Sequence, residues 1–354
     1  MRKKILMVGS SLDVKGGMTT VVEGFIENKF KDSEIIYVPT HIEKAMILQM
    51  LFFLRALIVI SCHLIFNDIK IVHIHFSEKG SFIRKSLVLK LSKIFNKKVI
   101  VHMHGAEFKQ FYNYSNNNKK IKIKEFLIES DKVIVLGESW KEFVAKLDDR
   151  INIEVMPNFV SCTDASVSFK NNKVNILFLA VLIKRKGIFD LIEAINLILN
   201  DNKFSSYEIN VIIAGTGEDE KQVIDRVKKL NIMENFEFKG WVGKDEKLKI
   251  LQNSQLFVLP SYNEGLPVSI LEAMSYGLPI ISTNVGSIED AVINDYNGRI
   301  INPGDINSLR ESIEYLINNK DIWNYFSKNS KHLVERKYDK EKYFLKMEKM
   351  YDLI

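Results

Sequence analysis

The sequence is poor in the features that mark several common classes of protein. It has two cysteines, Cys62 and Cys162, and neither has a second ligand-type residue close by, so we expect both to be reduced. No Asp-x-Asp pair occurs, which argues against the carboxylate pair that would hold a divalent metal on a diphosphate. The apolar run at 5–9 is too short for the core of a signal peptide, so we expect a cytoplasmic chain.

Long apolar runs are also scarce. Residues 45–66 are strongly apolar, but Gln49, Arg55 and His63 interrupt them, and the run barely reaches the length of a membrane span. The sequence therefore favours a helix that is buried or lies at a membrane surface over one that crosses the bilayer. Peripheral contact of the N-terminal half with the inner face of the plasma membrane stays open as an alternative.

The length and charge of the chain restrict the number of domains and the kinds of partner. The 354 residues are too many for one ordinary core and suit two α/β domains. The formal net charge of +6 falls short of a nucleic-acid-binding signature, so no nucleic-acid partner is expected. Cations gather at 79–98 and 119–124, which fits either solvated helix faces or a basic face for anionic lipid or a phosphate-bearing acceptor.

Short apolar runs predict buried parallel strands, and helical patterning separates them. In the first half the strands are expected at 5–9, 71–75, 99–104 and 133–136, and the helices near 18–30, 45–66, 81–95 and 122–130. In the second half the strands are expected at 175–180, 208–214, 235–239, 256–259 and 279–282, and the helices near 188–200, 218–230, 245–252, 267–276, 287–293 and 306–318, with two more in 321–353. This alternation predicts βαβ units with a parallel sheet in each half.

The alternation of predicted strands and helices is interrupted between the two halves of the chain. Residues 161–172 are rich in Ser, Thr, Asn and Asp and predict a linker. We therefore expect a Rossmann-like domain over 1–160, a second one over 173–335, and a last helix in 336–354 that returns to the first domain. A cleft between two such domains is the expected place for a ligand.

The most informative segment joins two glutamates. Pro267 suits the first position of a helix, so Glu264 is expected in the loop before it and Glu272 ~8 Å further along the helix axis. Two carboxylates so separated can accept hydrogen bonds from hydroxyl groups at the two ends of a nucleotide diphosphate sugar. The helix N-terminus between them, with the amides of Gly265 and Leu266, suits the diphosphate. The alternative is a surface glutamate and a helix glutamate paired with a lysine, and the spacing alone does not decide between the two.

Cations and glycines follow other predicted strands. Three consecutive cations, Lys184 to Lys186, come after 175–180. A solvated charge run is the alternative, but the carboxyl end of a parallel strand suits a diphosphate and favours function. Gly16 and Gly17 follow the first strand and let the backbone approach a ligand closely. The 215–217 turn lacks the third glycine of a dinucleotide-binding fingerprint, and an ordinary turn is an equal alternative for it.

Four histidines alternate on two predicted strands. His73 and His75 share one strand face, and so do His102 and His104. On neighbouring strands four imidazoles could bind zinc, but neither a cysteine nor a carboxylate completes the set. We favour one functional histidine among packed ones, and we expect no metal.

The stretch 259–286, which opens Leu-Pro-Ser-Tyr-Asn-Glu-Gly-Leu-Pro, is similar to the donor-binding signature of retaining GT-B glycosyltransferases of family 4, the glycosyl transferases group 1. The likeness extends over nearly the whole chain. It implies an α/β GT-B fold, in which two Rossmann-like domains have parallel sheets facing a central cleft. It also implies transfer of a sugar from a nucleotide diphosphate sugar, commonly a UDP-sugar, to a glycan or lipid-linked acceptor in bacterial surface polysaccharide synthesis. Because Asp-x-Asp is absent, we expect no metal, and no other cofactor is expected.

The resemblance also implies roles for individual residues. Glu264 and His104 would be catalytic at the transferred sugar, and Glu272 would contact the ribose. Lys186 matches the family's lysine, whereas Val181 stands where the family has an arginine. The other expected donor-side residues are Gly16, Gly17, Lys184, Arg185, Gly215, Gly217, Val242, Gly265, Leu266 and Pro267. The acceptor-side candidates are His75, Arg84, Lys85 and Glu107.

Two alternatives come from other functional classes. A nucleotide-sugar 2-epimerase can use the same fold without an acceptor, but the basic and apolar N-terminal surface argues against it. A non-catalytic binding or scaffold subunit is supported by Val181. It is opposed by Glu264, Lys186 and Glu272. Product analysis separates the first alternative from a transferase, and turnover of the donor separates the second.

Overall fold

The chain divides into two compact units. The computed structural model describes residues 2–169 and 172–354. The first unit contains Met1–Asn158 and Glu341–Ile354, and the second contains Phe159–Lys340. Of the predicted linker, residues 170 and 171 lie outside the described residues, and the remainder of 161–172 contains no helix or strand.

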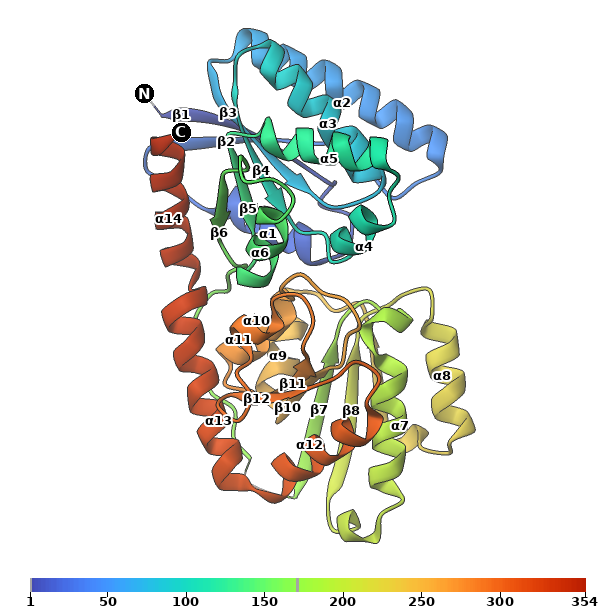
Figure 1. Cartoon of the computed structure of the whole chain (residues 1–354). Coiled ribbons are helices and arrows are strands. Elements are labelled where there is room, and N and C mark those ends of the chain that lie inside the picture. Colours follow the sequence, from blue (N-terminus) through green and yellow to red (C-terminus); the bar gives the residue numbers. More distant parts are fainter. Residues whose placement is uncertain (1, 170–171) are drawn as a thin grey trace. The chain divides into compact units, whose positions relative to one another are not determined.

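The first unit is built on a parallel sheet of six strands in the order β2-β1-β3-β4-β5-β6 (Figure 1). The strands are β1 (Lys3–Gly9), β2 (Ser33–Pro39), β3 (Ile69–Phe76), β4 (Lys98–Met103), β5 (Lys132–Val135) and β6 (Ile153–Val155). The helices are α1 (Gly17–Glu27), α2 (Met46–Phe66), α3 (Gly80–Ile94), α4 (Phe108–Asn113), α5 (Asn117–Ile128), α6 (Glu138–Ala145) and, from the end of the chain, α14 (Lys340–Leu353).

The two faces of this sheet are covered by different helices. Side chains of α2, α3, α5 and α6 join one face of the strands in a single apolar core. On the other face, Phe25 of α1 packs edge-on against Phe344 of α14, with ring centroids 5.0 Å apart. The hydroxyl group of Tyr351 on α14 is hydrogen-bonded to His73 of β3 at 2.7 Å. The last helix of the chain therefore completes the core of the first unit.

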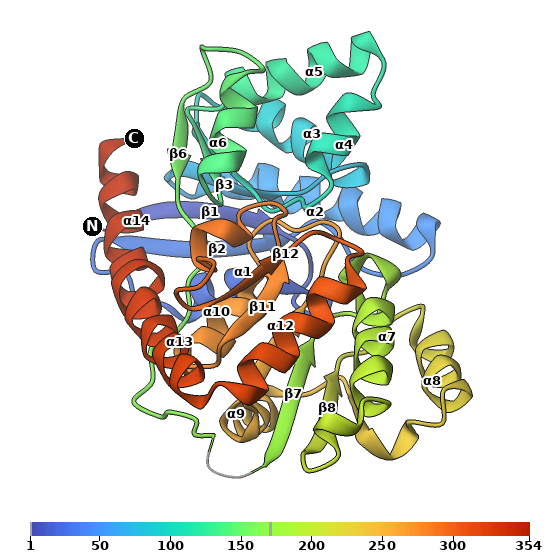
Figure 2. The same cartoon turned by 60° about the horizontal axis from the view of Figure 1, so that its bottom comes forward.

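The second unit repeats this architecture, with the strand order β12-β11-β10-β7-β8-β9. Its strands are β7 (Lys173–Leu179), β8 (Glu208–Ala214), β9 (Phe236–Gly240), β10 (Leu256–Leu259), β11 (Ile280–Thr283) and β12 (Gly298–Ile301). Its helices are α7 (Ile188–Leu199), α8 (Glu220–Lys229), α9 (Lys244–Asn253), α10 (Val268–Ser275), α11 (Ile288–Ala291), α12 (Ile306–Asn318) and α13 (Lys320–Leu333). Figure 2 shows α7, α8 and α12 grouped on one side of this sheet.

The predicted α/β class with a parallel sheet in each half is confirmed. The sequence did not predict β2, β6 and β12, or the helices α4 and α6. All three missed strands lie at the edges of their sheets. An edge strand has a neighbour on one side alone, so it needs fewer apolar residues and its hydrophobic pattern is weak. The burial pattern of β2, in which five of seven residues are exposed or partly exposed, is of this kind.

We expect the Phe344→Ala substitution to destabilise the first unit by about 3–5 kcal/mol, because it leaves a cavity against Phe25. Amide hydrogen exchange of the β1 and β3 segments measures this change. The neighbouring Leu345 is 63% exposed, so Leu345→Ala is the matched control and should shift stability by less than about 0.5 kcal/mol. Equal protection in both variants would show that α14 is not part of this core.

Candidate functional site

Each sheet contains one point where the strand order reverses. In the second unit β8 and β9 extend the sheet on one side of β7, whereas β10 lies on the other side of it. In the first unit β2 and β3 flank β1 in the same way. Because α/β sheets bind ligands beyond the carboxyl ends of the strands at such a reversal, the loops after β7 and β10 and after β1 and β3 are the first places to search.

An ion pair joins the loops at the reversal in the second unit. The Nζ atom of Lys186 donates to Oε1 of Glu264 at 2.6 Å, and the hydroxyl group of Ser261 donates to the same oxygen at 2.7 Å. The two charged side chains are 16% and 6% exposed. Charges so far from water are costly unless they are paired, and this pair supplies that compensation when no ligand is bound. The sequence predicted both charged residues and missed Ser261.

The turn that carries Lys186 is fixed against the loop that carries Glu264. This turn, η1 (Lys184–Lys186), is a single 3₁₀ turn after β7. The guanidinium group of Arg185 donates to the carbonyl oxygen of Asn263 at 3.0 Å. A Cβ atom on Gly187, whose φ is +74°, would lie 2.0 Å from the carbonyl oxygen of Pro260. Glycine is therefore required there, and the cationic turn is held in one position.

Glu272 lies inside α10 and forms a second ion pair, with Lys247 of α9. Burial raises the pKa of Glu272 above its usual value, and the positive charge of Lys247 opposes that rise. Lys247 was not anticipated from the sequence, because nothing in the pattern of α9 places it opposite α10. The prediction that Pro267 is the first helical residue is wrong by one position. The helix begins at Val268, and Pro267 precedes it with extended backbone.

The glycines after β8 serve close packing of two loops. A Cβ atom on Gly215, whose φ is +147°, would lie 1.9 Å from the carbonyl oxygen of Ala180, and one on Gly217 would lie 2.2 Å from that of Leu182. These contacts explain both glycines without a ligand. They therefore fit the alternative that 215–217 is an ordinary turn. Their contact with the donor stays a prediction.

The remaining donor-side residues lie in loops at the carboxyl ends of strands. Gly16 precedes α1 with φ +150° and would meet nothing within 4 Å of an added Cβ atom, so the space beside its backbone is open, and Gly17 begins the helix. Val242 is partly exposed after β9. Gly265 accepts a hydrogen bond from the amide of Ser287 at 2.8 Å, and the Leu266 side chain is buried.

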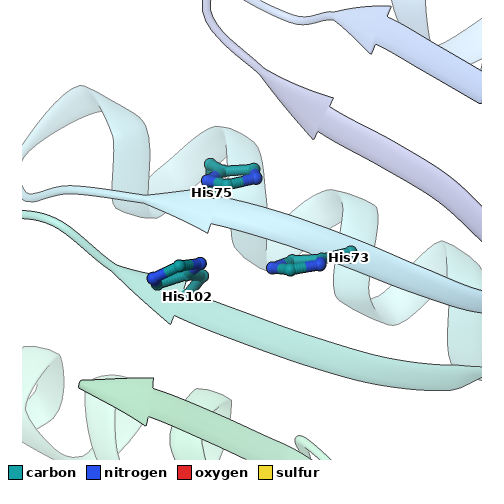
Figure 3. Close-up of side chains that lie close together, drawn as sticks. All are labelled: His73, His75 and His102. Carbon is teal, nitrogen blue, oxygen red and sulfur yellow. The ribbon is translucent and has the colours of Figure 1, made fainter. Parts of the chain in front are cut away.

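Three of the four histidines form a buried stack beneath α1. His73 and His75 of β3 and His102 of β4 lie side by side (Figure 3), and Phe25 packs edge-on against all three rings. One ring nitrogen of each lies within 4.8 Å of the others. Zinc at about 2.1 Å from each nitrogen would need these atoms closer, and the rings of His73 and His75, only 6° from parallel, do not aim at a common point. The expectation of no metal stays a prediction.

His104 is the member of the group that reaches the surface. It follows β4, is partly exposed, and one of its ring nitrogens lies 2.9 Å from His75. Burial lowers the pKa of both His73 and His104 to about 3, so both rings are neutral at pH 7. His75 therefore contacts the predicted functional histidine rather than open solvent, and His104 presents an uncharged imidazole.

A cationic cluster lies at the reversal in the first unit. Lys85 of α3 is 3% exposed, and its Nζ atom donates to the hydroxyl oxygen of Thr40 at 2.5 Å. Among the described residues, neither Nε of Arg84 nor Nδ1 of His41 has a hydrogen-bond partner, although both atoms are buried. The pKa of His41 is lowered by burial and then by the charges of Arg84 and Lys85. His41 was missed by the sequence analysis, because a lone histidine after an unpredicted strand carries no signal.

The rest of the basic segment is not a uniform cationic face. Lys93 and Lys98 both pair with Asp131, at 2.5 and 3.0 Å. Glu107, an acceptor-side candidate, pairs with Lys79 at 2.6 Å. Within the described part of this segment, the cations that form no ion pair with a carboxylate are Arg84, Lys85, Lys90 and Lys97.

We expect the stability of the first unit to fall as the pH is lowered from 7 to 5. The folded-state pKa of about 3 for His73 lies below the ordinary histidine pKa of 6.5, so the unfolded chain binds more protons and stability is lost below pH 6.5. Replacing His102, whose pKa is also lowered, with Phe should make this fall shallower by ~1.4 kcal/mol per pH unit. Hydrogen exchange of the β3 segment, corrected for intrinsic rates, measures it. The control His332→Phe lies in the second unit and should leave the pH dependence of β3 stability unchanged. If His102→Phe also leaves that pH dependence unchanged, the account is contradicted.

Comparison with known proteins supports the fold. Residues 163–333 match the family model described as glycosyl transferases group 1. A curated relative, the capsular polysaccharide biosynthesis glycosyltransferase CapM of Staphylococcus aureus, is 28% identical over 51% of this chain and 47% of its own length, so the chain spans about half of that protein. Sucrose-phosphate synthase from Thermosynechococcus elongatus has a TM-score of 0.82 and 16% identity over 99% of both chains. Anabaena HepE in complex with UDP has a TM-score of 0.77 and 14% identity over 99% of this chain and 100% of its own. The chain therefore has the GT-B fold and carries, over most of its second unit, a domain of the glycosyl transferases group 1 family.

Proposed function

We propose that the protein is a retaining glycosyltransferase that moves a sugar from a UDP-sugar to a lipid-linked or glycan acceptor in surface polysaccharide synthesis. The group 1 domain and the named activity of CapM support sugar transfer and a role in capsule synthesis. The structure of HepE in complex with UDP supports UDP as the nucleotide. We place the reaction in the cytoplasm, at the inner face of the plasma membrane.

The ion pair between Lys186 and Glu264 is the observation that carries this proposal. It lies at the strand reversal of the group 1 domain, where a ligand is expected, and it brings one positive and one negative group within 2.6 Å. A nucleotide diphosphate sugar needs both kinds of group, because its diphosphate is anionic and its sugar hydroxyls are hydrogen-bond donors. When the donor binds, its phosphate oxygens can replace Glu264 as the partner of Lys186, and the carboxylate is released to the sugar.

Charge on the departing diphosphate is then stabilised by protein groups. Lys186 and the neighbouring cations of η1 carry the positive charge, and fixed charges in a poorly hydrated site lower the barrier to leaving-group departure. Arg185 bonds the Glu264 loop and lies in the same turn, so it can take the place of the arginine that Val181 replaces. This arrangement requires no metal ion.

Other residues would contact the two ends of the donor, which are the ribose and the transferred sugar. Glu272 would accept hydrogen bonds from the ribose hydroxyls, and Lys247 would keep the carboxylate ionised against the effect of burial. His104, neutral at pH 7, would bond a hydroxyl group of the transferred sugar. We assign none of the described side chains as a nucleophile, so we propose attack from the face that the diphosphate leaves, with a phosphate oxygen taking the proton of the acceptor. Bond formation and departure on one face retain the anomeric configuration.

The acceptor side is assigned to the first unit. The unpartnered nitrogen atoms of Arg84 and His41 and the ammonium group of Lys85 match the phosphate of a lipid-linked acceptor. His75 and Glu107 are weaker candidates. His75 is buried and contacts His104, so it would act by positioning that ring, and Glu107 is engaged by Lys79.

We expect Glu264→Gln to reduce the rate of sugar transfer by about a hundredfold or more, because the amide no longer balances Lys186 or accepts as strongly from the sugar. Transfer from radiolabelled UDP-sugars to a membrane extract measures this loss. Glu208→Gln is the matched control, since Glu208 is an exposed glutamate of the same unit that pairs with Lys173. Full activity in a folded Glu264→Gln variant would refute the site.

Analysis of the product separates the alternatives to this function. Retention predicts that NMR of the product shows the anomeric configuration of the donor. Formation of the 2-epimer without any acceptor would identify an epimerase instead. An absence of turnover with all UDP-sugars, in a chain that still binds UDP, would identify a binding or scaffold subunit.

A further inference from the structure

The helix α2 has an apolar face that nothing in the described chain covers. Its inner residues Phe53, Ala56, Ile60 and Leu64 belong to the core of the first unit. Its outer residues follow a second stripe, also at helical spacing, and are large and exposed. They are Ile47 (69% exposed), Leu51 (54%), Leu54 (50%), Ile58 (66%) and Ile65 (57%).

The neighbouring helix α3 extends this surface. Figure 1 shows α2 and α3 alongside each other on one side of the first unit, and their residues are in contact. Ile83, Leu87 and Ile94 of α3 share one face at intervals of four and seven residues, and they are 62%, 46% and 74% exposed. We call these three residues and the five outer residues of α2 the outer apolar face. Soluble monomers rarely leave so many large apolar side chains together in water, so the face marks an interaction surface.

The charged side chains within α2 and α3 are all cationic. Neither α2 nor α3 contains an aspartate or glutamate. Arg55 and Lys90 are both exposed, on α2 and α3 respectively, and within the part of the chain that the structure describes neither forms an ion pair. Apolar residues bordered by unpaired cations are the pattern of surfaces that bind anionic membranes.

The packing of α2 against the core indicates whether this helix crosses a membrane or lies on its surface. The helix is long and apolar enough to span, but its inner stripe is in the core and it connects β2 to β3 within one sheet. A spanning orientation would pull Phe53, Ile60 and Leu64 out of that core. With its inner side held by the sheet, the helix can offer a bilayer its outer side alone.

We propose that the outer apolar face binds an anionic lipid bilayer, with α2 lying in the plane of the membrane interface. A second copy of this chain is the other occupant to consider. A two-fold dimer through this face would bring Arg55 and Lys90 of one copy near the same cations of the other, which is unfavourable. Anionic headgroups complement those charges. The proposal deepens the proposed placement at the inner face of the plasma membrane and rests on that part of the proposed function. It is tested without any donor, so its failure would remove the membrane placement and leave the proposed sugar transfer untouched.

Flotation of the full-length chain with vesicles measures the binding directly. Vesicles of phosphatidylcholine with about one third phosphatidylglycerol should carry the chain upward, and the fraction bound should be lower on phosphatidylcholine alone. The double variant Leu54→Glu and Ile58→Glu should bind the anionic vesicles about tenfold or more weakly, since it places two charges in the apolar contact. The matched control is Leu345→Glu and Leu353→Glu, at two exposed leucines of α14 in the same unit (63% and 88%), and it should bind like the unmodified chain.

Three results would overturn the proposal. The first is that the unmodified chain fails to float with anionic vesicles. The second is equal binding by the α2 variant, when circular dichroism shows that both chains are folded. The third is a dimer in lipid-free solution that the α2 variant dissociates and the α14 variant does not, which would assign the face to a second copy.

Discussion

The loops of the second unit depend on one costly contact, the buried ion pair between Lys186 and Glu264. Removing both charges from water is unfavourable, and the pair persists because its surroundings hold it. Ser261 donates to the carboxylate, Arg185 ties the cationic turn to Asn263, and Gly187 allows that turn to approach Pro260. A site assembled in this way is already arranged for a ligand that presents negative charge to the lysine and hydroxyl groups to the glutamate. Little reorganisation is then needed when the donor binds.

The buried polar groups of the first unit are stabilised without an ion pair of this kind. Its buried histidines are neutral, because burial disfavours the imidazolium form, and they stack under Phe25. Its buried cation, Lys85, has a hydroxyl group as its close partner instead of a carboxylate. An anion that binds there would give Lys85 a partner of opposite charge. The outer apolar face of α2 and α3 gives the same unit a surface suited to lipid, so both features fit an acceptor that combines a phosphate group with a hydrocarbon chain.

The sequence was most informative where chemistry and secondary structure coincide. Glu264 was predicted from its place in the loop before a helix, and Lys186 from its place after an apolar strand. The structure places the two in contact. Edge strands were missed because half-exposed strands such as β2 lack a strong hydrophobic pattern, and His41 was missed with them. Lys247 and Ser261 could not be foreseen, because their importance comes from a neighbour brought close by the fold. The outward direction of the apolar side chains of α2 was equally hidden, since a nearly uniformly apolar helix does not reveal which side is covered.

Thermal unfolding in the presence of nucleotides tests the central claim, that the site around Lys186 and Glu264 binds the diphosphate of a nucleotide sugar without a metal. UDP at about a hundredfold excess over its dissociation constant should stabilise the native chain by ~2.7 kcal/mol and raise its melting temperature. The account predicts that this rise persists in EDTA and is lost in Lys186→Met, while UMP gives a smaller shift because it lacks the second phosphate. A rise that disappears with EDTA, or one that Lys186→Met retains in full, would contradict it.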